Sequence, residues 1–119
     1  MVALNFAASF APAVESGRKR QTIREKRRCE VGQALQLYTG QRTRACRKLG
    51  EATCTGVSRV RLYLDEIVVD DNTLAGKAAD AVAKADGFGS YDEMATWFLD
   101  TYGALPFNGW LIQWELSDG

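Results

Sequence analysis

The chain has 119 residues, of which 46% are hydrophobic and 25% are charged, as in ordinary folded domains. This length predicts a single domain over residues 1–119 with one sizeable hydrophobic core. The chain contains no histidine, which excludes Ser-His-Asp and Cys-His nucleophile systems and the usual zinc ligand sets.

The formal net charge of zero conceals an uneven distribution of charge along the chain. Residues 1–61 carry 13 of the 15 basic residues and four acidic residues, for a net charge of +9. Residues 62–119 carry two basic and 11 acidic residues, for a net charge of −9. Such a division is typical of a positive surface that binds phosphates or an acidic partner, although the two halves can also interleave and cancel.

The location of the protein is predicted from its apolar runs, its first residues and its cysteines. No apolar run reaches the ~18 residues that a membrane span needs, and the basic cluster follows the uncharged start instead of preceding it, unlike a secretory signal. Cys29, Cys46 and Cys54 form no C-x-x-C pair, and reduced thiols fit a cytosolic protein. We therefore predict a cytoplasmic protein with no membrane association, no metal and no cofactor, and leave its oligomeric state open.

The first elements follow from apolar spacing and from the positions of turn residues. Residues 2–6 alternate as a strand, and Ser9 is expected to cap a short helix after it. Gly17 suits the position just past the end of that helix, where a left-handed conformation is needed. Residues 19–24 are predicted to enter a strand, and residues 25–33 to form a charged connection.

From residue 34 the pattern becomes that of β-strands. Residues 34–39 alternate between apolar and polar side chains, and residues 42–49 are a second candidate strand. Residues 51–64 form a longer β-rich stretch in which Gly56 is expected to mark a bulge or a bend. Residues 67–69 are one more short strand.

The remaining segments are predicted to be two helices and a last strand. Apolar residues recur at helical spacing over residues 74–85, and Gly87 supplies the stop. Residues 90–93 (Ser-Tyr-Asp-Glu) are a capping box that begins a second helix, which Gly103 ends. Residues 110–116 form the closing strand. These elements predict an α+β fold, in which a small closed or nearly closed β-barrel carries a short N-terminal helix and a late helical pair, because closure leaves no strand edges.

The densest positive charge surrounds the segment Gly17-Arg18-Lys19-Arg20-Gln21-Thr22-Ile23-Arg24. If residues 21–24 are extended, Thr22 and Arg24 share one face of the strand. A lysine just upstream can then meet a hydroxyl and a guanidinium in one small pocket. The alternative is a solvated basic turn with no binding role.

This segment resembles the G-x-K-x-x-E-x-R signature of the ASCH domain family, a branch of the PUA-like β-barrel superfamily. Gly17, Lys19 and Arg24 match the signature, and Thr22 stands where the family usually has glutamate. The small bacterial acetylcytidine amidohydrolases of this family share the G-R-K-x-x-T-I-R version. The resemblance also covers the order of the elements, the Val31-Gly32-x-x-Leu35 entry to a strand, and the Ala85-Asp86-Gly87-Phe88 corner.

The resemblance implies a PUA-like barrel that binds RNA or a modified nucleoside in a basic cleft lined by this motif. For an amidohydrolase it implies Lys19, Thr22 and an acid as catalytic residues, and Asp86 is the best-placed acid. A lysine that is crowded by arginines and partly buried has its charged form disfavoured, so that it can take a proton from water or from the Thr22 hydroxyl. Asp86 would donate a proton to the leaving amine, and Arg24 would hold an anionic oxygen or a phosphate.

Further ligand contacts are expected from nearby basic and aromatic side chains. The ligand-binding residues predicted in this way are Gly17, Arg18, Arg20, Arg24, Tyr38, Arg42 and Arg44. Tyr38, Tyr63 or Phe88 is available to stack on a base, whereas core packing is expected for Trp97, Phe98 and Trp110. Binding of RNA or a modified nucleoside without chemistry is the first interpretation. The alternatives are deacylation of an acetylcytidine-like nucleoside, ribonuclease activity and a protein-binding adaptor.

Overall fold

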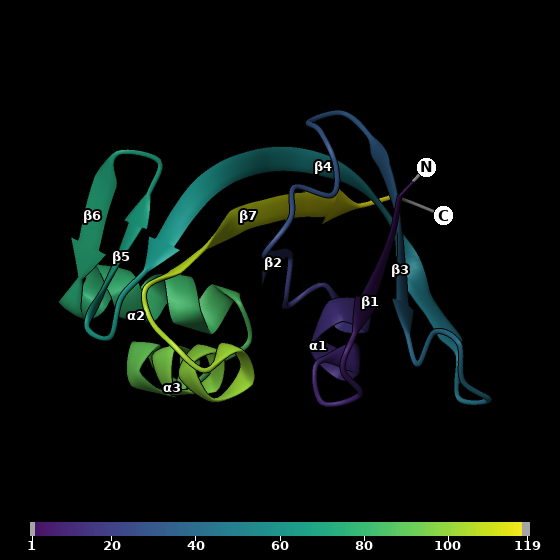
Figure 1. The fold of residues 1–119 in the computed structure, drawn as a ribbon. Coiled ribbons are helices and arrows are strands. Elements are labelled where there is room, and N and C mark those ends of the chain that lie inside the picture. The colour runs from purple at the N-terminus through teal and green to yellow at the C-terminus, as the bar shows by residue number, and fades with distance from the viewer. Residues whose placement is uncertain (1, 118–119) are drawn as a thin grey trace.

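The computed structural model describes residues 2–117, and a strongly curled mixed sheet dominates it (Figure 1). The strands are β1 (Val2–Phe6), β2 (Gln21–Arg24), β3 (Ala34–Thr39), β4 (Arg47–Leu62), β5 (Glu66–Val69), β6 (Asn72–Ala75) and β7 (Phe107–Leu116). The helices are α1 (Ala11–Ser16), α2 (Gly76–Ala85) and α3 (Tyr91–Tyr102). The predicted α+β class, with a short early helix and a late helical pair, is confirmed.

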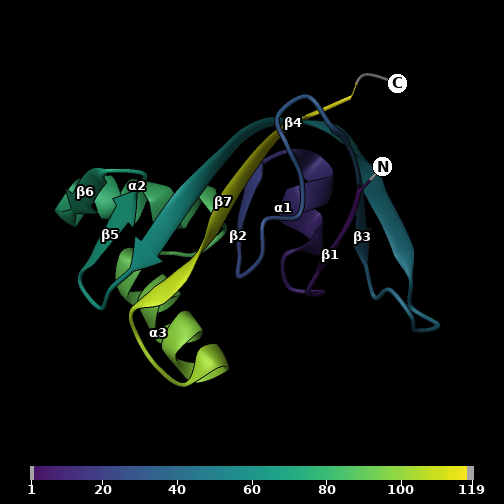
Figure 2. The ribbon, with the colours of Figure 1, turned by 45° about the horizontal axis from the view of Figure 1, so that its top comes forward.

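The sheet is a half-barrel built on two long antiparallel strands, β4 and β7, which arch over the helices in Figures 1 and 2. On one side of β4 lie β3 and then β1, which runs parallel to β3, and on the far side of β7 lies β2. Within residues 2–117 no strand pairing joins β1 to β2, so the barrel curls without closing. We call the space between these two strands the seam.

The curvature of the sheet is concentrated in β4. Its pairing register with β7 shifts between Cys54 and Gly56, as expected for a bulge at this glycine. A Cβ atom on Gly56 would lie 2.8 Å from the Gln113 side-chain oxygen, so the close approach of the two strands also requires glycine. Gly56 itself pairs with Gln113, and Thr55 is the residue left without a partner in β7, so the bulge lies directly beside the glycine at which it was predicted.

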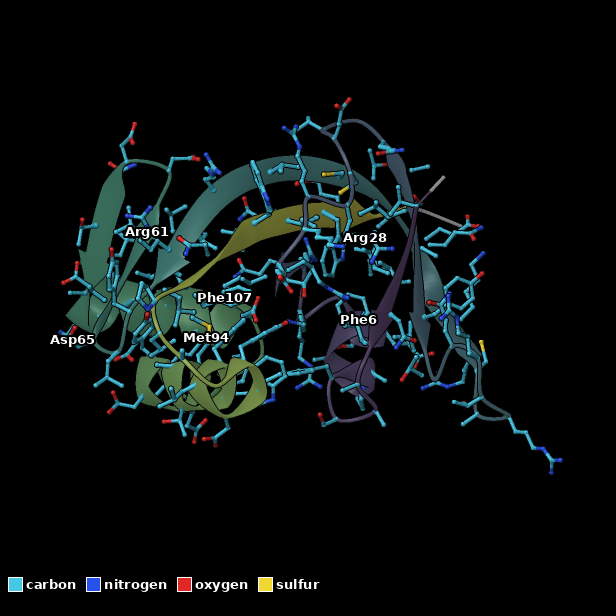
Figure 3. The ribbon with its side chains drawn as sticks, viewed as in Figure 1. Phe6, Arg28, Arg61, Asp65, Met94 and Phe107 are labelled. Carbon is cyan, nitrogen blue, oxygen red and sulfur yellow. The ribbon has the colours of Figure 1, made fainter. Side chains whose placement is uncertain are left out.

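Two hydrophobic clusters lie under the two halves of the arch. The first is formed mainly by β1, α1, β3 and β4 and includes Phe6, and the second joins the sheet to α2 and α3 and includes Met94 and Phe107 (Figure 3). β7 contributes to both clusters, with Ile112 in the first and Phe107 in the second. The seam lies where the two clusters meet, and this position brings α1, β2 and the helical pair together.

Three local predictions are wrong. Residues 42–46 form a turn instead of a strand, because the Thr43 hydroxyl donates to the Gly40 carbonyl at 2.6 Å and accepts from the Ala45 amide at 3.1 Å. Residues 74–75 belong to β6, whose pairing with β5 overrides the helical spacing there, so α2 begins at Gly76. The residue that caps α1 is Phe10, without a side-chain hydrogen bond, and not Ser9.

Candidate functional site

A small pocket opens at the seam, beside the corner between α2 and α3. Its volume is about 150 Å³, and β1, β2 and α3 supply most of its walls. Its charged and hydroxyl-bearing side chains are Lys19, Thr22, Arg24 and Asp86, and its aromatic side chains are Phe6, Phe10, Phe88, Trp97, Phe98 and Tyr102. Concave sites with apolar walls and a few convergent polar groups are typical of small-molecule binding. We call this site the seam pocket.

The turn after α1 places Lys19 in the pocket. Gly17 follows the helix with a φ of 83°, as predicted from its position, and reverses the chain. The Lys19 amide then donates to the Ala13 carbonyl at 2.9 Å, which holds the turn against the helix. The lysine side chain is directed inward, and the residue is only 3% exposed.

Lys19 meets Asp86, which caps the end of α2. The Lys19 Nζ lies 3.4 Å from Asp86 Oδ2 and also donates to the Asp86 backbone carbonyl. The side chains of the two residues are 3% and 6% exposed. Gln21 Nε2 donates to Asp86 Oδ1 at 3.5 Å, and the Phe10 ring centroid is 4.7 Å from the lysine nitrogen. The ion pair is therefore enclosed by an amide and aromatic rings.

Burial changes the protonation of both members of this pair. Desolvation lowers the pKa of Lys19 below its ordinary value, against the attraction of the Asp86 carboxylate. Desolvation likewise raises the pKa of Asp86 to about 6, although Lys19 and Gln21 oppose the change. Burial disfavours the charge on each group. Titratable groups with such shifts in a concave site are typical of binding and catalytic centres.

Thr22 and Arg24 line the pocket from β2, on the same face of that strand, as predicted from their spacing. Arg24 Nε donates to Thr22 Oγ1 at 3.3 Å, and its terminal nitrogen donates to the Asn5 carbonyl of β1 at 2.7 Å. Burial lowers the pKa of Arg24, and the nearby Arg28 lowers it further. Arg24 thus spans the seam and orients a hydroxyl group within the pocket.

The structure brings Lys19, Thr22, Arg24 and Asp86 together, but the other predicted ligand contacts lie elsewhere. Outside the seam pocket are Gly17, Arg18, Arg20, Tyr38, Arg42 and Arg44. The exposed Arg18 and Arg20 bond locally, to the Ser16 hydroxyl at 3.1 Å and the Gly17 carbonyl at 2.8 Å. Tyr38, on β3, donates to Gln36 Oε1 at 3.2 Å.

Two tryptophans expected in the core are not buried there. Trp97 is 40% exposed at the rim of the seam pocket, although the neighbouring Phe98 is 2% exposed as predicted. Trp110 is half-buried, and the guanidinium carbons of Arg27 and Arg59 lie 5.4 Å and 5.2 Å from its ring centroid. The available signal was the density of aromatic residues in α3, because one helix face cannot bury all of them.

A larger hollow, of about 620 Å³, is lined in part by Trp110. Its lining mixes Arg59 and Arg61 with Asp70 and Asp71, all of them exposed. No buried charged group lines this hollow among residues 2–117. The seam pocket is therefore the better candidate for chemistry, although it is smaller.

Within the part of the chain that the structure describes, no three Cys, Asp or Glu side chains lie close enough to hold a metal ion. The three cysteines are unpaired by disulfides. None of the described helices has the length and apolar character that crossing a bilayer requires.

Comparison with known proteins does not assign the chain to a family. No family model matches the chain, and no curated protein and no solved structure is significantly similar to it. The resemblance to the ASCH family thus stays a prediction from sequence, and the function is argued below from the residues of the seam pocket.

Proposed function

We propose that the seam pocket binds the base of a modified nucleoside, with a cytidine derivative as the first candidate. The observation that carries this proposal is a buried Lys19–Asp86 pair at the inner end of an aromatic pocket. The edge of a cytosine ring presents both hydrogen-bond acceptors and an amino donor. Lys19 supplies donors, and the Asp86 carboxylate supplies acceptors, so the pair complements such an edge.

The aromatic rim supports the same proposal. Trp97 and Tyr102 line the pocket and are 40% and 45% exposed, so their rings are accessible to a ligand. Stacking of a base on an aromatic side chain is worth about 1–3 kcal/mol. The rim would therefore provide affinity, while Lys19 and Asp86 would select the base.

Binding is tested with free nucleosides and two variants of α3. We expect cytidine or N4-acetylcytidine to bind in calorimetry more tightly than adenosine. Trp97→Ala should weaken this binding about tenfold or more, because it removes a stacking surface. The matched control is Leu99→Ala: Leu99 is 38% exposed on the same helix but does not line the pocket. Equal affinities in both variants, or no nucleoside binding at all, would reject the proposal.

A second candidate function is hydrolysis of the amide of an N-acylated cytidine, and the convergence of Lys19, Thr22 and Asp86 favours it. Neutral Lys19 would take a proton from water as the water oxygen attacks the amide carbonyl, or from the Thr22 hydroxyl as its oxygen attacks, in which case a water then hydrolyses the acyl-threonine ester and restores the hydroxyl. Arg24 would stabilise the oxyanion. Protonated Asp86, whose pKa is raised to about 6, would donate to the leaving amine. Water and amide would thus become a carboxylic acid and an amine.

Deacylation is measured directly, by chromatography of acylated cytidines incubated with the protein. Lys19→Ala should reduce turnover at least 100-fold, because general acid–base catalysis typically contributes that much. Thr22→Val, which keeps the shape of the side chain and removes its hydroxyl, is the gentler variant. Both variants are checked for folding by circular dichroism. No turnover by folded wild-type protein that binds the nucleoside would exclude the hydrolase and leave the binding function.

We also propose that the half-barrel is a PUA-like fold of the ASCH type. The Gly17-x-Lys19-x-x-Thr22-x-Arg24 motif supports this, because its lysine, threonine and arginine line one pocket. A cytoplasmic location is proposed as well, and the free state of the cysteines is in accord with it.

A further inference from the structure

Two of the three free thiols lie next to each other inside the fold. Cys29, in the connection between β2 and β3, has its sulfur 3.7 Å from that of Cys54 on β4, although 25 positions separate the two residues. They are 4% and 1% exposed, and both belong to the hydrophobic cluster that includes Phe6. The two sulfurs are only about 1.7 Å farther apart than in a disulfide, so a small movement brings them to bonding distance.

The backbone holds the end of the connection against Cys54. The Gly32 amide donates to the Cys54 carbonyl at 2.8 Å, and the Cys54 amide donates to the Gln33 carbonyl at 2.9 Å. The Cys54 thiol donates to the Gly56 carbonyl at 3.6 Å, which leaves its sulfur as the acceptor for the Cys29 thiol. The fold therefore places the two thiols together through fixed backbone contacts.

The rest of the connection is exposed. Within residues 25–32, every residue except Cys29 is exposed, and none lies in a helix or a strand. Arg28 reaches across the seam and donates to the Ala3 carbonyl of β1 at 3.2 Å, and Figure 3 shows Arg28 close to the start of β1. A segment with exposed backbone and one buried anchor opens at low cost in free energy. A covalent bond at that anchor would restrict this opening.

We propose that Cys29 and Cys54 form a reversible disulfide when the protein meets a peroxide, and that this bond locks the connection between β2 and β3 onto β4. The proposal goes beyond the function proposed for the seam pocket and does not depend on it. Disulfides of cytosolic proteins are usually transient and sense the redox state. Free thiols at rest, which become joined on oxidation, fit that pattern.

Cys29 is the thiol that reacts first. Burial raises the pKa of Cys29 above its ordinary value, and so does the neighbouring Cys54, so that the closed connection keeps it as an unreactive thiol. When the connection opens, water reaches the thiol, and the adjacent Arg27 and Arg28 favour its thiolate. The thiolate attacks hydrogen peroxide: an S–O bond forms, the O–O bond breaks, and the released hydroxide takes a proton to become water. Cys29 is then a sulfenic acid.

Cys54 completes the reaction once the connection closes again. Its sulfur attacks the sulfenic sulfur of Cys29, so that an S–S bond forms and the S–O bond breaks. The hydroxide that leaves takes the thiol proton of Cys54 and becomes a second water. In total, two thiols and one hydrogen peroxide give one disulfide and two waters, with both sulfurs oxidised and both peroxide oxygens reduced. A dithiol such as dithiothreitol reverses the change.

The first test asks which pair of cysteines the fold selects. Reduced wild-type protein is treated with hydrogen peroxide, blocked with N-ethylmaleimide and digested for mass spectrometry. Cys46 and Cys54 are only eight positions apart, whereas Cys29 and Cys54 are 25 apart. Because the probability of closure falls as the −3/2 power of loop length, the chain unfolded in urea should join Cys46 to Cys54 roughly fivefold more often. The folded protein should reverse this order.

The second test measures the lock by hydrogen exchange in Cys46→Ser, which lacks the exposed thiol. Peroxide should slow the exchange of residues 26–32 by about tenfold or more, and dithiothreitol should restore the original rate. The matched variant carries Cys54→Ala in addition, so that it keeps Cys29 without a partner. Its exchange should not slow on oxidation.

The two tests separate the bond from its effect. If the folded protein joins Cys46 to Cys54, links two chains or only accumulates sulfinic acid, the buried pair does not form a disulfide and the proposal fails. If Cys29 and Cys54 are joined but exchange of residues 26–32 is unchanged, the lock is rejected. The first result comes from the wild-type chain, so it decides the matter of the bond even if a variant does not fold.

Discussion

The ammonium group of Lys19 lies 3.4 Å from the carboxylate of Asp86, although 67 positions separate the two residues in the chain. Their contact depends on β2 and the end of α2 meeting at the seam. A buried ion pair pays a desolvation cost that often cancels its attraction, so it is weak support for stability. Its place in an aromatic pocket therefore supports the proposed binding function more than it supports a role in stability.

Removing the lysine should leave Asp86 buried without its counter-ion. We expect Lys19→Met to lower the free energy of unfolding by about 3–5 kcal/mol at pH 7. Urea denaturation measures this change. Lys84→Met, at an exposed position on α2, should change it by less than about 0.5 kcal/mol. Equal stability of the two variants would mean that the Lys19–Asp86 pair makes no net contribution to the free energy of unfolding.

Asp86 should make stability depend on pH in a narrow window. Its pKa rises from 3.8 to about 6 on folding, so between these pH values the folded protein retains a proton that the unfolded chain has released. The contribution of Asp86 to the free energy of unfolding therefore falls as pH rises from about 4 to about 6, and is level above this window. The free energy of unfolding of wild type, minus that of Asp86→Asn, should therefore fall by roughly 3 kcal/mol as pH rises through this window. A difference that stays constant from pH 4 to pH 7 would contradict the assignment.

Gly87 should be sensitive to a methyl group for two reasons. Its φ is +101°, and an added Cβ would lie 3.0 Å from the Phe10 ring and 3.4 Å from Lys19 Cδ. We expect Gly87→Ala to cost about 1–3 kcal/mol of stability and to weaken nucleoside binding. Gly103→Ala is the matched control, because φ is +82° there but no atom lies within 4 Å. If both variants bind nucleoside as wild type does, the close approach of Gly87 to Phe10 and Lys19 does not set the shape of the seam pocket.

Cys29 should hold the connection between β2 and β3. Within residues 25–32 it is the only fully buried residue, and its sulfur lies 3.7 Å from that of Cys54. Cys29→Ser places a hydroxyl in an apolar cluster and should cost about 1–3 kcal/mol. Hydrogen exchange of residues 26–32 should accelerate in this variant and stay unchanged in Cys46→Ser, at an exposed position. Unchanged exchange in Cys29→Ser would show that the connection is held by other contacts.

Much of the seam pocket could be predicted from local rules. Thr22 and Arg24 share a face because strand side chains alternate, and Gly17 ends α1 because it adopts a left-handed conformation. Gly87 likewise ends α2, and Asp86 just before it points to Lys19. Each of these features depends on a few neighbouring residues.

The features that could not be predicted depend on distant parts of the chain. Leu74 fits a helix by spacing, but it pairs with Ile67 across a hairpin, and this pairing decides its conformation. From its residue type Trp97 is expected in the core, but α3 turns the next residue, Phe98, into the core and leaves Trp97 at the rim of the pocket. The convergence of Arg28 and Arg42 at one hollow depends on the curl of the whole sheet.

The bonds from Arg24 and Arg28 to β1 have a consequence for self-association. Among residues 2–117, β1 pairs with β3 alone and is an edge strand, and an edge with free carbonyls can recruit a strand from another copy of the chain. The two arginines occupy carbonyls at this edge and bring positive charge to it, so that two copies would repel one another there. Replacing both arginines with short neutral residues should therefore make the protein prone to aggregation. The variant would then precipitate when the protein is concentrated.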